Sequence, residues 1–364
     1  MPQQKSQARV DTNRWTAVKE CGVRHRVLVI GVGSIGERHL RCFRATDRAD
    51  VALTEVRDDV RGDVAARYGV EAAFANMDAA LAWRPDAAVI ATPAPLHVAM
   101  ATRLAEAGIH ILVEKPLSIA LEGIDRLREA VSRRGVTAAV AYVYRSHPLL
   151  SAMRRAVLAG RIGRPVELVA VAGQHFPTYR PAYREIYYAD RATGGGAIQD
   201  ALTHLLNAGE WLLGRIDRLV ADAAHQVLEG VSVEDTVHLL ARHQAVLASY
   251  SLNQHQAPNE MTITVMGTQG TVRCEFHRHR WRFQDRPDQA WRDENIAPLE
   301  RDTMFVAQAN TFLDAVEGNA PVLCSLEEGI QTLRVNLAAL ASVRCRTWQT
   351  VSPDEASAFG SQGA

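Results

Sequence analysis

The chain has no excess of charge of either sign and few cysteines. Lysine plus arginine number 41 of the 364 residues, and aspartate plus glutamate also number 41. No global field therefore favours nucleic acid or an anionic membrane. The five cysteines are scattered and form no CxxC pair, which argues against a disulfide framework or a structural zinc site and for a reducing compartment. We expect a cytoplasmic protein.

Long apolar segments are missing as well. No uncharged apolar run approaches the roughly 20 residues that a membrane-spanning helix needs. The first 24 residues lack the apolar stretch of a signal peptide, and we interpret residues 1–24 and 352–364 as terminal tails. Because one core rarely supports a chain of this length, the sequence predicts two domains.

The first domain is expected at residues 25–145, where short apolar runs alternate with helical patterns. Strands are predicted at 26–30, 50–55, 86–91, 110–113 and 136–144. Helices are predicted after Gly36 and at 60–68, 96–107 and 121–134. Alternation of this kind is typical of a doubly wound α/β domain with a parallel sheet.

The second domain is expected at residues 146–351, where this alternation stops. A helix at 149–159 and a strand at 165–172 lead to the run Gly194–Gly196 and a long helix ending at Leu213. Several β-rich runs then follow from 218 to 283 without intervening helices, and two helices at 305–316 and 326–345 close the chain. This order predicts an α+β domain with a mostly antiparallel sheet.

A GxGxxG motif stands where a dinucleotide-binding turn requires it, between a strand and a helix. Gly31 permits the tight turn, Gly33 lets the backbone approach a pyrophosphate, and Gly36 allows close helix packing. Glu55 ends the next strand, where a carboxylate binds the ribose and repels a 2′-phosphate. NAD is therefore favoured, with NADP possible because Arg57 offsets that repulsion. The expected cofactor residues here are Gly31, Gly33, Ser34, Ile35, Gly36, Glu55 and Arg57.

Further motifs carry a family resemblance. The stretches GVGSIGERH, ATPAPLH, EKPLS, AYVYRSHP and GGGAIQDALTH, followed by Trp211, occur in this order. Together they resemble the Gfo/Idh/MocA family, the relatives of glucose-fructose oxidoreductase and inositol dehydrogenase, over residues 24–351. The resemblance implies a Rossmann domain joined to a domain with a large open sheet. It also adds Thr92, Pro93, His97, Glu114 and Lys115 to the expected cofactor residues.

The resemblance places the reaction at three side chains. It implies that Lys115 lies near the nicotinamide and the reacting oxygen, and that Asp200 and His204 form the D-x-x-x-H pair. Four residues apart on a predicted helix, the pair shares one face. We expect His204 to accept the hydroxyl proton and Asp200 to orient the imidazole or to bind a neighbouring hydroxyl. Lys115 would stabilise negative charge on oxygen.

The stretch 179–188 is rich in tyrosine and arginine, which stack on sugar rings and bind anionic groups. It predicts a substrate loop, and a subunit contact is an equal alternative.

His277 and His279 would share one face of a strand but have no third ligand nearby, so no metal is expected. The expected substrate residues are Lys115, Tyr144, His147, Tyr183, Arg184, Asp200 and His204.

These observations predict an NAD(P)-dependent dehydrogenase or reductase that acts on a hydroxyl or carbonyl group of a sugar, polyol or sugar derivative. One alternative keeps NAD tightly bound for redox-neutral chemistry such as epimerisation, elimination or glycoside cleavage. Another is a non-catalytic, dinucleotide-binding regulator. We also expect a homodimer or homotetramer that forms through the open sheet.

Overall fold

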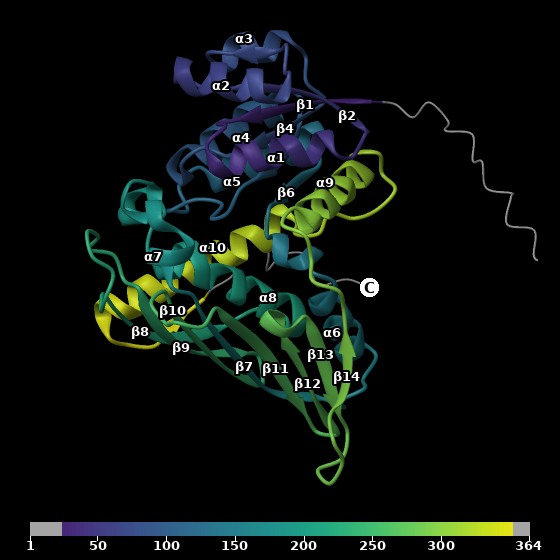
Figure 1. The fold of residues 1–364 in the computed structure, drawn as a ribbon, viewed down its shortest axis with the longest axis vertical. Helices are drawn as coiled ribbons and strands as arrows, with labels where there is room; N and C mark the ends of the chain where they lie inside the picture. The colour runs from purple at the N-terminus through teal and green to yellow at the C-terminus, as the bar shows by residue number, and fades with distance from the viewer. Residues whose placement is uncertain (1–23, 352–364) are drawn as a thin grey trace, which may run out of the picture.

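The computed structural model describes residues 24–351, so the predicted tails lie outside the described residues except for Arg24. Two sheets form the molecule (Figure 1). The smaller sheet has six strands in the order β3-β2-β1-β4-β5-β6, and all its pairings are parallel. The strands are β1 (His25–Ile30), β2 (Ala49–Thr54), β3 (Ala73–Phe74), β4 (Ala87–Ile90), β5 (His110–Val113) and β6 (Ala138–Val140).

Helices connect these strands, as the alternating pattern predicted. They are α1 (Ser34–Arg44), α2 (Asp58–Tyr68), α3 (Met77–Ala82), α4 (His97–Glu106) and α5 (Ile124–Arg134). The strand cores are fully buried because both faces are covered; Val27, Leu28 and Val29 are 0% exposed. The predicted doubly wound fold is therefore confirmed.

The strand predicted at 136–144 is shorter than expected. β6 ends at Val140, and Val143–Ser146 forms a single 3₁₀ turn. The backbone N–H of Val140 donates to Cys324 from the far end of the chain instead of to another strand. The chain then leaves the sheet through the 3₁₀ turn, and Cys324 covers this part of the edge of the sheet.

The larger sheet has nine strands in the order β14-β13-β12-β11-β7-β10-β9-β8-β15. Its neighbours are antiparallel except β7 and β10, which run parallel. The strands are β7 (Pro165–Gly173), β8 (Arg218–Ala224), β9 (Thr236–His243), β10 (Val246–Asn253), β11 (Glu260–Gly267), β12 (Gly270–Glu275), β13 (Arg280–Gln284), β14 (Arg292–Asn295) and β15 (Gln349–Thr350).

Only one face of this sheet is covered within the described residues. Helices α6 (Pro148–Leu158), α8 (Thr203–Leu213) and α10 (Leu326–Cys345) pack on it (Figure 1). The opposite face exposes apolar side chains on three neighbouring strands: Val171 on β7, Leu240 on β9 and Leu247 on β10. No helix of the described part of the chain is long and apolar enough to cross a membrane.

Two C-terminal helices return to the first sheet. Helix α9 (Thr303–Val316) packs on α1, and its Phe312 and Leu313 share a core with Val27 and Leu40. The first turns of α10, including Ile330, complete the core on the other face of the sheet. The nucleotide-binding half is therefore built from both ends of the chain.

The segment that carries His277 and His279 differs from the prediction. Phe276–Arg278 forms a 3₁₀ turn between β12 and β13, and His279 has a left-handed backbone with φ of 50°. The predicted strand face with both histidines does not exist, because the chain reverses direction at this point.

Candidate active site

The glycine-rich loop has the space that a dinucleotide requires. Gly31 has φ of 80°, and a Cβ on Gly36 would lie 1.8 Å from the carbonyl oxygen of Gly31. A Cβ on Gly33 would meet nothing within 4 Å, so the loop backbone is open to a ligand. Ser34 follows at the exposed first turn of α1, where free N–H groups and the helix dipole favour a phosphate. The residues present fit NAD.

Glu55 supports this loop from the end of β2. Its Oε2 accepts a 3.1 Å hydrogen bond from the N–H of Val32, and its Oε1 accepts from the N–H of Arg57 at 3.2 Å and from Nε of Arg57 at 3.3 Å. Arg57 itself is exposed. The carboxylate and the guanidinium therefore lie side by side where the ribose is expected.

The second cofactor loop, from Thr92 to His97, is fixed by His97 itself. Its buried ring nitrogens lie 2.7 Å from the carbonyl oxygen of Thr92 and 3.0 Å from that of Pro116. Burial lowers the pKa of His97. Because a neutral ring donates one hydrogen bond, His97 donates to only one of these two carbonyl oxygens, and its buried ring lies between its own loop and the segment after Lys115. Pro93 precedes the turn Ala94–Leu96 at the exposed surface.

Glu114 contacts the cofactor helix and not the cleft. Its Oε1 lies 2.7 Å from Nε2 of His39 on α1, and its Oε2 accepts from the backbone N–H of Lys115 at 3.0 Å. Burial opposes ionisation of Glu114, but His39 and Lys115 outweigh it and lower its pKa. The sequence analysis did not predict this contact, because no local pattern pairs His39 with Glu114.

Lys115 and Asp200 form a buried ion pair across the two halves. Nζ of Lys115 donates to the backbone oxygen of Asp200 at 2.9 Å and to its Oδ1 at 3.0 Å. Burial lowers the pKa of Lys115, but the charge of Asp200 outweighs it and raises that pKa overall. Burial likewise raises the pKa of Asp200, while Lys115 and Arg180 hold it well below its usual range. Both groups are charged at neutral pH.

His204 lies between two tyrosines. Tyr144 stacks on its ring with centroids 4.7 Å apart, and Tyr142 meets it edge-on at 6.0 Å. Nδ1 of His204 is buried without a hydrogen-bond partner among the described residues. Burial, reinforced by the charge of Lys115, lowers the pKa of His204 to about 3. The imidazole is therefore neutral at physiological pH.

Asp200 does not hydrogen-bond to His204 in the described chain, because the helix that carries the pair is not regular. Ile198–Leu202 forms a π-helix, and α8 begins only at Thr203. The four-residue spacing therefore does not stack the two side chains as on an α-helix. The carboxylate binds Lys115 and the hydroxyl of Tyr187 instead. π-Helical turns of this kind often occur at functional sites.

The run of three glycines before this helix is set by close approaches. A Cβ on Gly194 would lie 3.2 Å from Cβ of Ala94 in the cofactor loop. A Cβ on Gly195 would lie 2.3 Å from the carbonyl oxygen of Tyr188. A Cβ on Gly196 would lie 2.6 Å from Oε1 of Glu234. Gly194 thus lets the segment before the helix approach the loop that carries Ala94.

Three predicted substrate residues have their polar groups engaged elsewhere. Tyr183 is buried in a small apolar cluster, and its hydroxyl donates to the carbonyl oxygen of Glu229 at 2.8 Å. Arg184 donates to the same carbonyl at 2.9 Å. His147 caps α6 by accepting from the N–H of Leu149. None of the three hydrogen-bonds to the Lys115–Asp200 pair.

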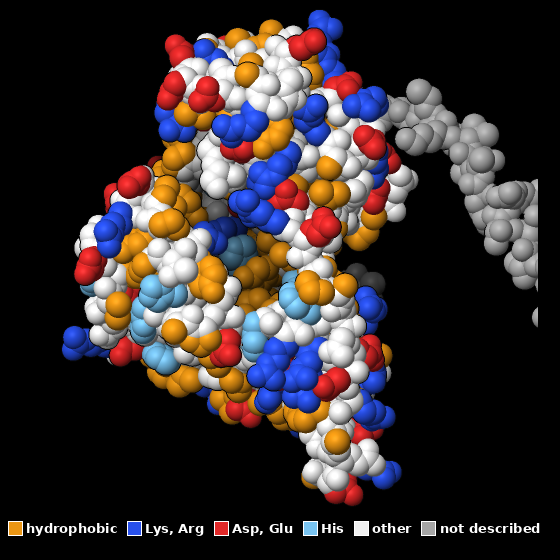
Figure 2. Space-filling view, viewed as in Figure 1, with side chains coloured by type: hydrophobic (Ala, Val, Ile, Leu, Met, Phe, Trp, Pro, Cys, Tyr) orange, Lys and Arg blue, Asp and Glu red, His pale blue; other side chains and the backbone are white. Residues whose placement is uncertain are grey.

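The same loop supplies two other residues to the site. The hydroxyl of Tyr187 donates to Oδ1 of Asp200 at 2.6 Å. The charge of Asp200 raises the pKa of Arg180. The tyrosine- and arginine-rich composition indicated this loop, but not which of its side chains face inward. Figure 2 shows the molecule hollowed between the two halves, with basic, histidine and apolar side chains in the hollow.

A parallel sheet with an open glycine turn, facing a buried lysine–aspartate pair, defines a dinucleotide-binding oxidoreductase. The chain belongs to the Gfo/Idh/MocA family. Residues 25–142 match the model of the oxidoreductase family with an NAD-binding Rossmann fold, and residues 150–273 match the GFO/IDH/MocA C-terminal domain. The cofactor of this oxidoreductase is accordingly NAD.

The chain is similar to curated dehydrogenases over most of its length. It is 24% identical to levoglucosan dehydrogenase of Pseudarthrobacter phenanthrenivorans over 89% of this chain and 97% of that protein. It is 28% identical to inositol 2-dehydrogenase of Rhizobium meliloti over 86% of this chain and 96% of that protein.

The fold is shared with solved structures. A levoglucosan dehydrogenase in complex with NADH and levoglucosan has a TM-score of 0.82 at 22% identity, covering 91% of this chain and 100% of that one. The WlbA dehydrogenase from Bordetella pertussis, in complex with NADH and UDP-GlcNAcA, has a TM-score of 0.76 at 24% identity, with the same coverage.

Proposed function

We propose that this protein is an NAD-dependent dehydrogenase that oxidises a hydroxyl-bearing carbon of a sugar or polyol, or reduces the corresponding carbonyl. The observation that carries the proposal is the Lys115–Asp200 ion pair at the end of the cofactor sheet. The charge of Lys115 lowers the pKa of the neutral His204 imidazole, and the charge of Asp200 raises it. The names of the similar curated dehydrogenases support a sugar or polyol as substrate.

NAD, when bound, accepts a hydride from the substrate carbon. The glycine loop and the N-terminus of α1 would hold its phosphates, and Glu55 its adenosine ribose. The carboxylate of Glu55 disfavours a 2′-phosphate, while Arg57, which lies beside it, is available to pair with one. We therefore propose a preference for NAD with residual use of NADP.

Lys115 would stabilise the substrate oxygen. An ammonium group has three N–H donors, and two of them point at Asp200. The third is available to the substrate oxygen as negative charge develops there. Because the pKa of Lys115 is raised, this group stays protonated and does not act as the base.

His204 would accept the hydroxyl proton. Its ring is neutral at physiological pH and the residue is partly exposed, so the imidazole can take up a proton. Asp200 does not orient this ring through a hydrogen bond. We infer that Tyr144 and Tyr142 hold the imidazole by packing, while Asp200 fixes Lys115.

Substrate-dependent formation of NADH, followed by its absorbance with a panel of sugars and polyols, tests this function. We expect turnover that falls at least about 100-fold in Lys115→Met, with NADH binding retained. A reduced-nicotinamide absorbance carried by the purified protein itself would instead support the redox-neutral alternative. NADH binding without turnover on the whole panel would favour the regulator.

The two-domain division and the oligomer belong to the same proposal. We infer that residues 25–145 bind NAD and that residues 146–351 form most of the substrate side, with α9 packed on α1. The exposed apolar face at Val171, Leu240 and Leu247 fits a second copy of this chain. Light scattering at micromolar concentration should show a dimer or tetramer, and a monomeric mass would contradict this.

A further inference from the structure

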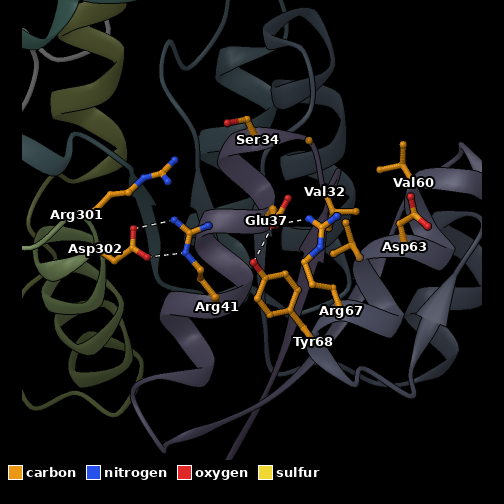
Figure 3. A pocket seen from close by; sticks show the side chains of 12 residues that line it. Val32, Ser34, Glu37, Arg41, Val60, Asp63, Arg67, Tyr68, Arg301 and Asp302 are labelled. Atoms are coloured by element: carbon orange, nitrogen blue, oxygen red, sulfur yellow. Dashed lines mark hydrogen bonds and ion pairs between the residues drawn. The ribbon is translucent and has the colours of Figure 1, made fainter. Parts of the chain in front are cut away.

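A cavity of about 670 Å³ opens beside the glycine-rich loop. One wall is formed by Gly33 and Ser34, at the start of α1. Arg301 and Asp302, which precede α9 some 270 residues later in the chain, line one side of the cavity (Figure 3). No sequence motif assigns the residues of this side to the cofactor.

Positive charge exceeds negative charge on the Arg301 side of the cavity. Asp302 is engaged by Arg41, whose Nε and second guanidinium nitrogen donate to the two carboxylate oxygens at 2.5 and 2.8 Å. Nε of Arg38 lies 3.4 Å from Oδ1 of Asp302, but it is buried and makes no hydrogen bond with the described residues. Three guanidinium groups thus lie around one carboxylate, and of the three only Arg41 hydrogen-bonds to it.

Arg301 is the third of these groups. It forms no ion pair or hydrogen bond with the described residues, and its guanidinium extends towards Ser34 in Figure 3. Burial lowers the pKa of Arg38, and the charge of Arg301 lowers it further. Phe305 packs on Arg38, with its ring centroid 4.9 Å from the guanidinium carbon.

This arrangement has the features of a phosphate site. The unpaired N–H groups at the start of α1 attract an anion, Gly33 leaves room for it, and a planar guanidinium binds two phosphate oxygens at once. We propose that Arg301, with Arg38 behind it, binds the diphosphate of the dinucleotide from the C-terminal part of the chain. This inference rests on the NAD site alone and not on the proposed chemistry.

Binding measurements on the full chain test this contact without turnover. Isothermal titration with NADH, ADP-ribose and adenosine separates the diphosphate from the rest of the ligand. We expect Arg301→Ala to lower the affinities for NADH and ADP-ribose about tenfold, because one charge-assisted hydrogen bond is lost. Adenosine affinity should stay the same. Because Arg301 is exposed, the variant should keep the melting temperature of the wild type.

Arg67→Ala is the matched control, because Arg67 lines the same cavity but is paired with Glu37 at 2.9 Å. It should leave all three affinities within twofold. Arg301→Lys keeps the charge without the planar fork and should lose less affinity than Arg301→Ala. Unchanged NADH affinity in Arg301→Ala would overturn the proposal. An equal loss for adenosine, or an equal loss in Arg67→Ala, would do the same.

Discussion

Tyr187 donates a 2.6 Å hydrogen bond to Oδ1 of Asp200, the oxygen that also lies 3.0 Å from Nζ of Lys115. One carboxylate oxygen therefore joins a loop tyrosine to the lysine at the end of β5 (His110–Val113). Burial, followed by the charge of Asp200, raises the pKa of Tyr187, so the phenol remains a donor. The loop that carries Tyr187 thus helps to hold the Lys115–Asp200 ion pair.

Removing this hydroxyl tests the contact. We expect Tyr187→Phe to reduce kcat/KM about 10- to 100-fold, because a hydrogen bond to a charged group contributes roughly 1.5–3 kcal/mol. Steady-state kinetics measure the effect. Tyr179→Phe is the control, since Tyr179 is exposed in the same loop. Equal kinetics in both variants would show that Tyr187 does not support the reacting geometry.

His204→Asn tests the proposed base. A positioned general base contributes about 10²- to 10⁴-fold, so kcat should fall by that order while the affinity for NADH is retained. Because burial and Lys115 lower the pKa of His204 to about 3, its protonation should not limit kcat/KM of the wild type between about pH 5 and about pH 7. A wild-type rate in the variant would assign the proton to another group.

Glu55→Ala tests cofactor choice. The carboxylate holds the N–H of Val32 and would bind the ribose, so its loss should weaken NAD about tenfold. The affinity for NADP should rise relative to the affinity for NAD, because the repulsion of a 2′-phosphate disappears while Arg57 remains. Asp58→Ala, an exposed carboxylate paired with Arg61, is the control. An unchanged ratio of the two affinities would exclude Glu55 from this role.

Several buried histidines make stability depend on pH. Burial lowers the pKa of His147 to about 4 and that of His204 to about 3, and it also lowers those of His97 and His243. The unfolded chain binds these protons near pH 6.5, roughly the ordinary histidine pKa. Stability should therefore be complete above about pH 6.5 and fall as the pH drops towards about 4.

Urea unfolding across that pH range measures how steeply the free energy of unfolding depends on pH. His147→Asn should make the slope shallower, because asparagine still caps α6 (Pro148–Leu158) but does not titrate. A slope that is identical in the wild type and the variant would show that His147 is not protonated preferentially in the unfolded chain.

Much of the fold follows from local signals. The helix predicted at 326–345 is observed at these bounds because Ser325 and Glu328 form a capping box and the helix ends at a left-handed residue, Arg346. The strand predicted at 136–144 was too long, because the apolar run continues to Val143 while the chain already enters the 3₁₀ turn Val143–Ser146. Short pieces such as β3 and β14 carry too few residues for any periodicity.

The site was predictable to the extent that motifs carry it. Lys115, Asp200 and His204 were expected together, and the structure places an ion pair between the first two. The loop residues were not predictable individually. The one-turn helices of this loop are too short for a periodic pattern that would show which side chains face inward. Tyr183 packs in an apolar cluster, while the hydroxyl of Tyr187 donates to Asp200.

The packing of α9 and α10 against the first sheet has a consequence for biosynthesis. The strands that form the nucleotide-binding sheet leave the ribosome first, and domains generally fold as they emerge. Here, however, Phe312, Leu313 and Ile330 are needed to cover that sheet. The NAD-binding half is therefore synthesised before the helices that cover it, and its apolar faces stay uncovered until α9 and α10 have left the ribosome.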